Sequence, residues 1–126
     1  MAKGGYPVAT LFIVEDEELL HQIYQTILAQ GGHRVVGVAF NGAEAIEKVH
    51  KLEPKPDIII MDHRMPVMDG LTATKELKHK LHSCRIIFIS ADETVKEASL
   101  AAGAALFIVK PVGIAELLKA VNSLVK

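Results

Sequence analysis

Five short apolar runs, spread along the whole chain, constrain the fold more than any other feature of the sequence. Each run is rich in β-branched residues and is continuous rather than alternating. Continuous runs of this kind are typical of strands that are buried on both faces of a sheet. The five predicted strands cover residues 9–14, 34–40, 57–61, 85–90 and 104–110.

The stretches between these runs have the apolar spacing of amphipathic helices. Residues 17–30 carry leucine and isoleucine at three- and four-residue intervals, and Gly31-Gly32 supply a stop. The strict alternation of strand and helix predicts an α/β fold with a parallel sheet, right-handed crossovers and helices on both faces. The other predicted helices cover about 42–52, 71–81, 92–102 and 112–125, with Gly103 able to adopt the left-handed conformation after the fourth.

Length and composition favour one small globular domain. The 126 residues contain no linker, repeat or low-complexity segment, so we predict a single domain over 1–126 with a core at about 9–125. Fourteen Lys and Arg against 15 Asp and Glu give a net charge of −1, which provides no overall field to attract nucleic acid or an acidic membrane surface. A single cysteine excludes an internal disulfide, and no signal-like or long apolar segment is present, so the cytoplasm is the expected compartment.

Polar residues stand at the carboxyl ends of four of the five predicted strands. Glu15 and Asp16 follow the first strand, Asp62 follows the third, Ser90 ends the fourth and Lys110 ends the fifth. Singly, the acids and the serine have an ordinary explanation as helix caps, and the lysine as a solvated charge. Carboxyl ends of parallel strands share one edge, where ligands collect at the topological switch point. The occurrence of polar residues at four of the five strand ends therefore predicts a functional site at that edge.

The chemistry of these groups favours phosphoryl transfer to an aspartate. Two carboxylates about 4 Å apart repel by about 4 kcal/mol at an effective dielectric constant of about 20, so a proton or a cation must compensate. A cluster of oxygen ligands without a Cys or His pair suits a hard cation such as Mg²⁺ or Mn²⁺. Asp62 would attack phosphorus in line, the metal and Lys110 would neutralise the phosphoryl oxygens, and the Ser90 hydroxyl would donate to one of them.

Four segments resemble the signature segments of the receiver domains of two-component response regulators, in order and at the family's spacing. The resemblance covers essentially the whole chain. It implies the flavodoxin-like doubly wound (βα)5 fold, a three-layer sandwich with strand order 2-1-3-4-5. The segments are LFIVEDEELL (11–20), IIIMDHRMPVMDG (58–70), IIFISA (86–91) and AGAALFIVKP (102–111).

The resemblance also implies roles for individual residues of the site. Asp62 matches the phosphoacceptor, which receives its phosphoryl group from a phosphohistidine. Asp16 matches a direct metal ligand, alongside Asp62 and the backbone carbonyl of Arg64. Glu15 stands where aspartate is commoner, and its longer side chain is expected to act through a metal-bound water or Lys110. Lys110 matches the lysine that binds the phosphoryl group.

Switching and lifetime are expected to depend on further residues. Ser90 matches the hydroxyl switch residue, where threonine is commoner, and Phe107 matches the aromatic switch residue. The bond before Pro111 is cis in many family members. Arg64 and Asp92 flank the expected path of hydrolytic water, and their opposite charges could pair over the phosphoryl group and slow its loss.

The resulting expectation is a phosphorylation-dependent signalling switch that relays its state through the surface of the fourth helix, fifth strand and fifth helix. It would catalyse only its own phosphorylation and dephosphorylation and would not be an enzyme in the usual sense. The expected partners are a sensor histidine kinase or phosphotransfer protein and a downstream protein or output domain, without nucleic acid or membrane. The apolar edge at Ala105 and Leu106 makes a phosphorylation-enhanced homodimer a further candidate.

Two other classes of protein share parts of this pattern. A Mg²⁺-dependent phosphohydrolase that forms an aspartyl phosphate usually needs a second aspartate two residues after the nucleophile, where this chain has Arg64. A flavin- or nucleotide-binding module would need a glycine- or hydroxyl-rich phosphate loop after the first strand. This chain has the sequence EDEE at that point, which repels phosphate without a metal.

Overall fold

A parallel five-stranded sheet forms the centre of the computed structural model, which describes residues 7–125. The predicted domain limits at residues 1 and 126 lie outside the described residues. The strand order is β2-β1-β3-β4-β5, as predicted. The strands are β1 (Thr10–Val14), β2 (Arg34–Ala39), β3 (Ile58–Asp62), β4 (Arg85–Ser90) and β5 (Leu106–Val109), and the helices are α1 (Glu18–Gln30), α2 (Gly42–Lys51), α3 (Gly70–Lys80), α4 (Lys96–Ala101) and α5 (Ile114–Leu124).

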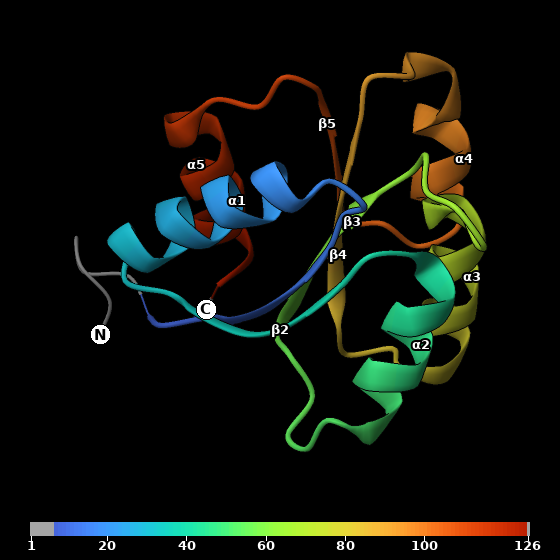
Figure 1. Ribbon diagram of the computed structural model, residues 1–126, viewed down its shortest axis with the longest axis horizontal. Helices are drawn as coiled ribbons and strands as arrows, with labels where there is room; N and C mark the ends of the chain where they lie inside the picture. The colour runs from blue at the N-terminus through green and yellow to red at the C-terminus, as the bar shows by residue number, and fades with distance from the viewer. Residues whose placement is uncertain (1–6, 126) are drawn as a thin grey trace.

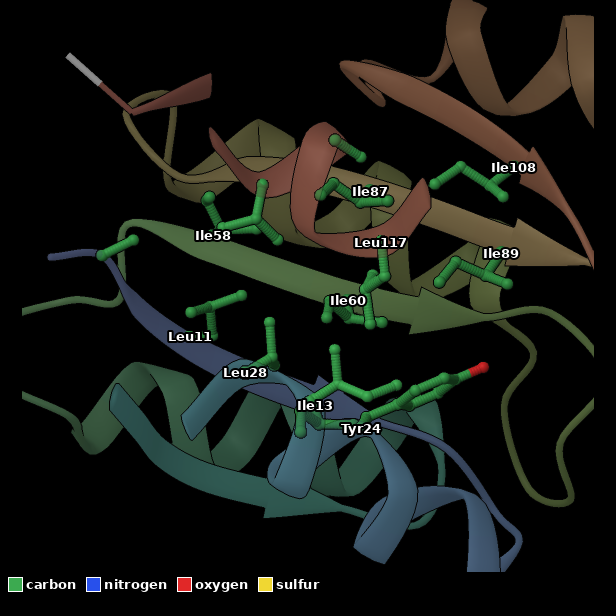
Figure 2. Close-up of a cluster of buried hydrophobic side chains, with 14 residues drawn as sticks. Leu11, Ile13, Tyr24, Leu28, Ile58, Ile60, Ile87, Ile89, Ile108 and Leu117 are labelled. Atoms are coloured by element: carbon green, nitrogen blue, oxygen red, sulfur yellow. The ribbon is translucent and has the colours of Figure 1, made fainter. Parts of the chain in front are cut away.

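The helices cover the sheet on both faces, with α1 and α5 on one side and α2, α3 and α4 on the other (Figure 1). Alternate residues of each central strand supply the two resulting cores. The core under α1 and α5 is shown in Figure 2 and contains Leu11, Ile13, Ile58, Ile60, Ile87 and Ile89. The core under α2 and α3 contains Phe12, Val14, Ile59, Met61, Ile86 and Phe88. Continuous apolar runs thus reflect burial on both faces of β1, β3 and β4.

The two outer strands are less buried than their continuous apolar runs predict. Residues 35–38 of β2 are only half-buried, and Val109 of β5 is exposed. The prediction of burial on both faces is therefore wrong for β2 and β5, because each lies at an edge of the sheet. At the β2 edge, Lys48 Nζ donates to the carbonyl oxygen of Val38 at 2.9 Å. A lysine in this place discourages another strand from pairing with the edge.

The fourth helix begins later than its sequence pattern predicts. The Asp92 carboxylate accepts from the backbone N–H of Thr94 at 2.9 Å and caps a 3-10 turn, η2 (Glu93–Val95), so that α4 begins only at Lys96. Gly103 ends this segment at φ 113°, in the left-handed conformation that was predicted for it. No helix within residues 7–125 has both the length and the apolar character needed to cross a membrane.

The loop between β3 and α3 is packed tightly against the first residues of α2 and α3. The N–H of Gly70 donates to the carbonyl of His63 at 2.8 Å, and the N–H of Gly42 donates to the carbonyl of Met68 at 3.0 Å. Gly70 has no room for a side chain, since a Cβ atom there would lie 1.9 Å from the carbonyl oxygen of Asp62. Two glycines at helix starts therefore hold the chain that follows Asp62.

Candidate functional site

Strand alternation brings three of the predicted site residues to one face of the sheet. Glu15 continues the series Leu11 and Ile13, and Asp62 continues the series Ile58 and Ile60, all on the side of α1 and α5. Lys110 stands two residues after Ile108, which belongs to the same core. The three side chains meet at the carboxyl edge of the sheet.

The Lys110 ammonium bridges two buried carboxylates. Its Nζ atom lies 2.9 Å from Asp62 Oδ1 and 3.1 Å from Glu15 Oε1. The side chain of Glu15 is 1% exposed and that of Asp62 is 8% exposed. The second oxygen of Glu15 accepts from the backbone N–H of Glu17 at 3.1 Å. Both oxygens of Glu15 are thus already engaged by donors, which agrees with its expected contact with Lys110.

Asp16 completes a cluster of three acids. Glu15, Asp16 and Asp62 each offer a carboxylate oxygen, and these three oxygens all lie within 4.8 Å of one another. Asp16 is exposed, so its carboxylate faces the open side of the cluster. This all-oxygen set suits a hard divalent cation, for which Mg²⁺ and Mn²⁺ are the usual biological choices.

Burial, together with repulsion between carboxylates, raises the pKa values of the two buried acids, Glu15 and Asp62. Desolvation, followed by the charge of Asp62, raises the pKa of Glu15 from 4.5 to about 7, against the opposing effect of Lys110. Burial also raises the pKa of Asp62, although its hydrogen bond from Lys110 offsets part of that rise. Burial alone would lower the pKa of Lys110, but the hydrogen bond and charge of Asp62 raise it. The ammonium therefore remains charged between the two carboxyl groups.

Without a divalent cation, the free energy of unfolding is expected to fall as the pH rises from about 4.5 to 7. Glu15 keeps its proton in the folded state over this window but loses it in the unfolded state, so stability is lost as the pH increases. This shift corresponds to roughly 3 kcal/mol of stability between the two ends of the window. Urea unfolding at pH 5 and pH 8, with and without Mg²⁺, measures it, and added Mg²⁺ should restore stability mainly at pH 8.

Glu15→Gln is the control for this pH effect, because it removes the titrating carboxyl of Glu15 and leaves every other ionisable group in place. The glutamine variant should lack the part of the pH dependence that Glu15 contributes. Identical pH profiles of unfolding for the two proteins would contradict the assignment.

Ser90, Asp92 and Arg64 form a second group beside the acids. The N–H of Asp92 donates to Ser90 Oγ at 3.0 Å, and the Arg64 guanidinium donates to Asp92 Oδ2 at 3.3 Å. Hydrogen bonds from the Thr94 hydroxyl and backbone, together with Arg64, lower the pKa of the Asp92 carboxyl. The pairing of Arg64 with Asp92 that the sequence suggested is thus present, and it joins the loop after Asp62 to the loop after Ser90.

Phe107 lies half-buried on β5 and stacks on Phe88, with ring centroids 6.0 Å apart. The Phe88 ring in turn lies 5.7 Å from the ring of His63, the residue after Asp62. The Lys110–Pro111 bond is cis, as the resemblance implied, and Glu53–Pro54 is a second cis bond that was not predicted. Sequence reasoning also missed His21, a buried histidine that contacts the backbone of Glu15.

The fold and the acidic edge define a flavodoxin-like α/β domain with a candidate cation site at its switch point. Comparison with known proteins narrows this class. The model of the response regulator receiver domain family matches residues 11–122, and this chain belongs to that family. Receiver domains are signalling switches of two-component systems and not enzymes that turn over a separate substrate.

Individual relatives agree with this membership. Chemotaxis protein CheY of Bacillus subtilis is 40% identical over 114 residues, which cover 89% of this chain and 93% of that protein. A chain in the crystal structure of the CheX–CheY–BeF3–Mg²⁺ complex from Borrelia burgdorferi is 33% identical, with a TM-score of 0.87 over 94% of this chain and 90% of that chain. TrrA of Thermotoga maritima, solved with Mg²⁺ and BeF, is 27% identical, with a TM-score of 0.85 over 94% of this chain and 100% of that chain.

Proposed function

We propose that Asp62 is the phosphoacceptor of this receiver domain and that Glu15, Asp16 and Lys110 prepare it for phosphoryl transfer. The observation that carries the proposal is the bridging Lys110 ammonium, 2.9 Å from Asp62 and 3.1 Å from Glu15 beside the third acid. The relatives solved with Mg²⁺ and a beryllofluoride, an analogue of a phosphoryl group, support it.

The chemistry follows from the positions of these groups. Lys110 orients the Asp62 carboxylate through Oδ1. One oxygen of this carboxylate would attack phosphorus while the other remains available to the metal. The phosphorus–nitrogen bond of the donor phosphohistidine breaks as the new oxygen–phosphorus bond forms, and the imidazole retains the leaving electron pair. Mg²⁺, held by Asp16 and Asp62 with the backbone carbonyl of Arg64, would neutralise phosphoryl oxygens. Lys110 supplies the fixed positive charge on the opposite side.

The decisive experiment uses acetyl phosphate as a small phosphodonor. Intact-mass measurement should detect one phosphoryl group per chain in the presence of Mg²⁺ or Mn²⁺ and none in the presence of a chelator. Peptide mapping should place that group on Asp62. Modification at another residue, or modification that does not need the metal, would defeat the proposal.

The output is proposed to pass through Ser90 and Phe107. A phosphoryl group adds strong acceptor oxygens, which would draw the Ser90 hydroxyl away from the N–H of Asp92. Space behind Ser90 would then allow Phe107 to turn inward from its place on Phe88. The exposed apolar groups nearby, Leu100 and Val109, lie on α4 and β5, where a downstream partner or a second receiver would bind.

The phosphodonor protein is proposed to bind over α1 and the loop after β5. A cleft of about 490 Å³ opens there beside Lys110, and its lining is mainly apolar. Leu19 on α1 and Ile114, the first residue of α5, are 65% and 61% exposed. A sensor histidine kinase or phosphotransfer protein could bury these groups while it presents a phosphohistidine to Asp62. The cleft is lined by Leu20, Ile23, Tyr24, Ala91, Lys110, Pro111 and Val112.

Arg64→Ala and Asp92→Ala are each expected to shorten the lifetime of the phosphorylated form. The ion pair joins the loops that follow Asp62 and Ser90 at 3.3 Å, and there it would screen the phosphoryl group from water. Because the Arg64 side chain is 80% exposed and solvent screens the pair, we expect a modest effect of roughly a threefold to fivefold faster decay. Loss of the phosphorylated mass over time measures the decay.

The double variant tests whether the two substitutions act through their shared ion pair or independently of each other. It should decay no faster than either single variant, because both substitutions remove the same contact. Lys96→Ala, which removes a nearby surface cation, serves as the control for a general change in charge. Unchanged decay in both single variants would contradict the proposed screening.

A further inference from the structure

His21 is a buried histidine that lies directly beneath the acidic end of β1. It stands on α1 with its side chain turned inward, and only 2% of the residue is exposed. Its ring packs against Phe40 with centroids 4.5 Å apart. The position lies one helical turn after Glu17 and would suit an ordinary apolar core residue, so the polar ring needs an explanation.

One nitrogen of the His21 ring hydrogen-bonds to the backbone at the carboxyl ends of both β1 and β2. Nε2 lies 2.5 Å from the carbonyl oxygen of Glu15 and 3.1 Å from that of Ala39. Carbonyl oxygens only accept, so Nε2 carries the proton and donates to both of them. The same Ala39 oxygen accepts the N–H of Glu15 at 3.1 Å. His21 therefore adds a side-chain link at the point where the backbone pairing of β1 and β2 ends.

The other ring nitrogen shows what the protein gains from a histidine here. With the proton on Nε2, Nδ1 is a buried acceptor, and it has no hydrogen-bond partner within residues 7–125. An unpaired buried acceptor is unfavourable, and leucine or phenylalanine at this position would avoid that cost. What the histidine provides in return is the Nε2 donor to the carbonyl of Glu15.

That carbonyl belongs to the peptide between Glu15 and Asp16, the two acids that follow β1. The C=O of Glu15 and the N–H of Asp16 belong to one planar peptide, so fixing the oxygen fixes the direction in which the chain enters Asp16. The carboxylate of Asp16 is the exposed member of the three-acid cluster. We propose that His21 is a positioning residue that sets the affinity of the acidic cluster for Mg²⁺ by holding the peptide between Glu15 and Asp16.

The inference rests on the proposed function, because it assumes that the cluster binds Mg²⁺. It is tested by titrating ¹⁵N-labelled protein with Mg²⁺ at pH 8 and following the amide shifts by NMR. His21→Leu removes both ring nitrogens and keeps an apolar side chain. His21→Gln keeps an N–H donor at the same number of bonds from Cα. We expect about a tenfold or greater loss of Mg²⁺ affinity in the leucine variant, as for other residues that orient metal ligands.

The glutamine variant should bind Mg²⁺ within about threefold of the unsubstituted chain, because its donor can still reach the Glu15 carbonyl. His33→Leu is the matched control, because His33 is also buried and also ties strands to a helix. It accepts the N–H of Ala9 at 3.0 Å and bonds Asn122 at 2.8 Å, at the other edge of the sheet. His33→Leu should lower the melting temperature and leave the affinity for Mg²⁺ unchanged.

The possible results are distinct from one another. If the unsubstituted chain binds no Mg²⁺, the proposed function fails. If it binds Mg²⁺ and His21→Leu binds equally well, only the positioning role fails. Equal losses in the His21 and His33 variants would show a general effect of destabilisation and would overturn the role of His21. If His21→Leu does not fold, His21→Asn replaces it, because its shorter amide cannot reach the Glu15 carbonyl and should show the same weakening.

Discussion

Asp62→Asn is expected to abolish phosphorylation by acetyl phosphate. The amide oxygen can still accept from Lys110, and the side chain keeps its size, but the anion that attacks phosphorus is gone. Intact-mass measurement with Mg²⁺ should therefore detect no added phosphoryl group. Modification of the asparagine variant at the rate of the unsubstituted chain would contradict the assignment of Asp62.

The same variant should be more stable than the unsubstituted chain at pH 8 without a divalent cation. The charge of Asp62 is one of the causes that raise the pKa of Glu15, so its removal lets Glu15 pair with Lys110 without a competing carboxylate. Asp69→Asn is the control, because it makes the same chemical change at the other end of the loop that follows Asp62. Asn caps the start of α3 about as well as Asp, so this variant should keep both its stability and its phosphorylation.

Gly70→Ala should be among the most destabilising single-methyl additions that this chain allows. The added Cβ would lie 1.9 Å from the Asp62 carbonyl oxygen and 2.9 Å from His63 Cα, which are backbone atoms that cannot rotate away. Relief requires the β3–α3 loop to move, and we expect a loss of about 3 kcal/mol or more in the free energy of unfolding. Urea unfolding measures the loss, and any folded fraction should also be phosphorylated more slowly.

Gly113→Ala provides the matched comparison. Gly113 also stands at a helix start, as the residue before α5. Nothing lies within 4 Å of the position that its Cβ would occupy, and its φ of −79° is open to any residue. The stability of this variant should stay within about 1 kcal/mol of the unsubstituted chain. Similar losses in both variants would show that the close approach at Gly70 is not the cause.

The sequence predicted those parts of the molecule that depend on local pattern. Five apolar runs located the strands, and the polar residues at their ends identified the edge where Glu15, Asp62 and Lys110 meet. These predictions succeeded because strand periodicity and the parallel arrangement determine which ends share an edge. The pairing of Arg64 with Asp92 was also accessible, since each follows a strand end by two residues.

Other features depend on contacts that a single sequence does not reveal. The late start of α4 comes from the hydrogen bond between Asp92 and Thr94, which competes with the helical pattern of the residues that follow. The role of His21 depends on the carbonyl oxygens of Glu15 and Ala39, which only the folded chain brings to its ring. In the sequence, His21 is simply one polar residue inside an amphipathic helix. Gly70 is predictable as a turn residue, but its contact with the backbone of Asp62 is visible only in three dimensions.

The shared face of Glu15, Asp62 and Lys110 has a consequence for how the chain can change in evolution. Side chains alternate between the faces of a sheet, so deleting or inserting one residue within β1 or β3 would turn an acid toward the opposite core. Length changes in the loops at the amino ends of the strands do not alter which face of the sheet each strand residue points to. The loop of residues 52–57, between α2 and β3, is one such place. Insertions and deletions among related chains should therefore concentrate at the edge of the sheet remote from Asp62.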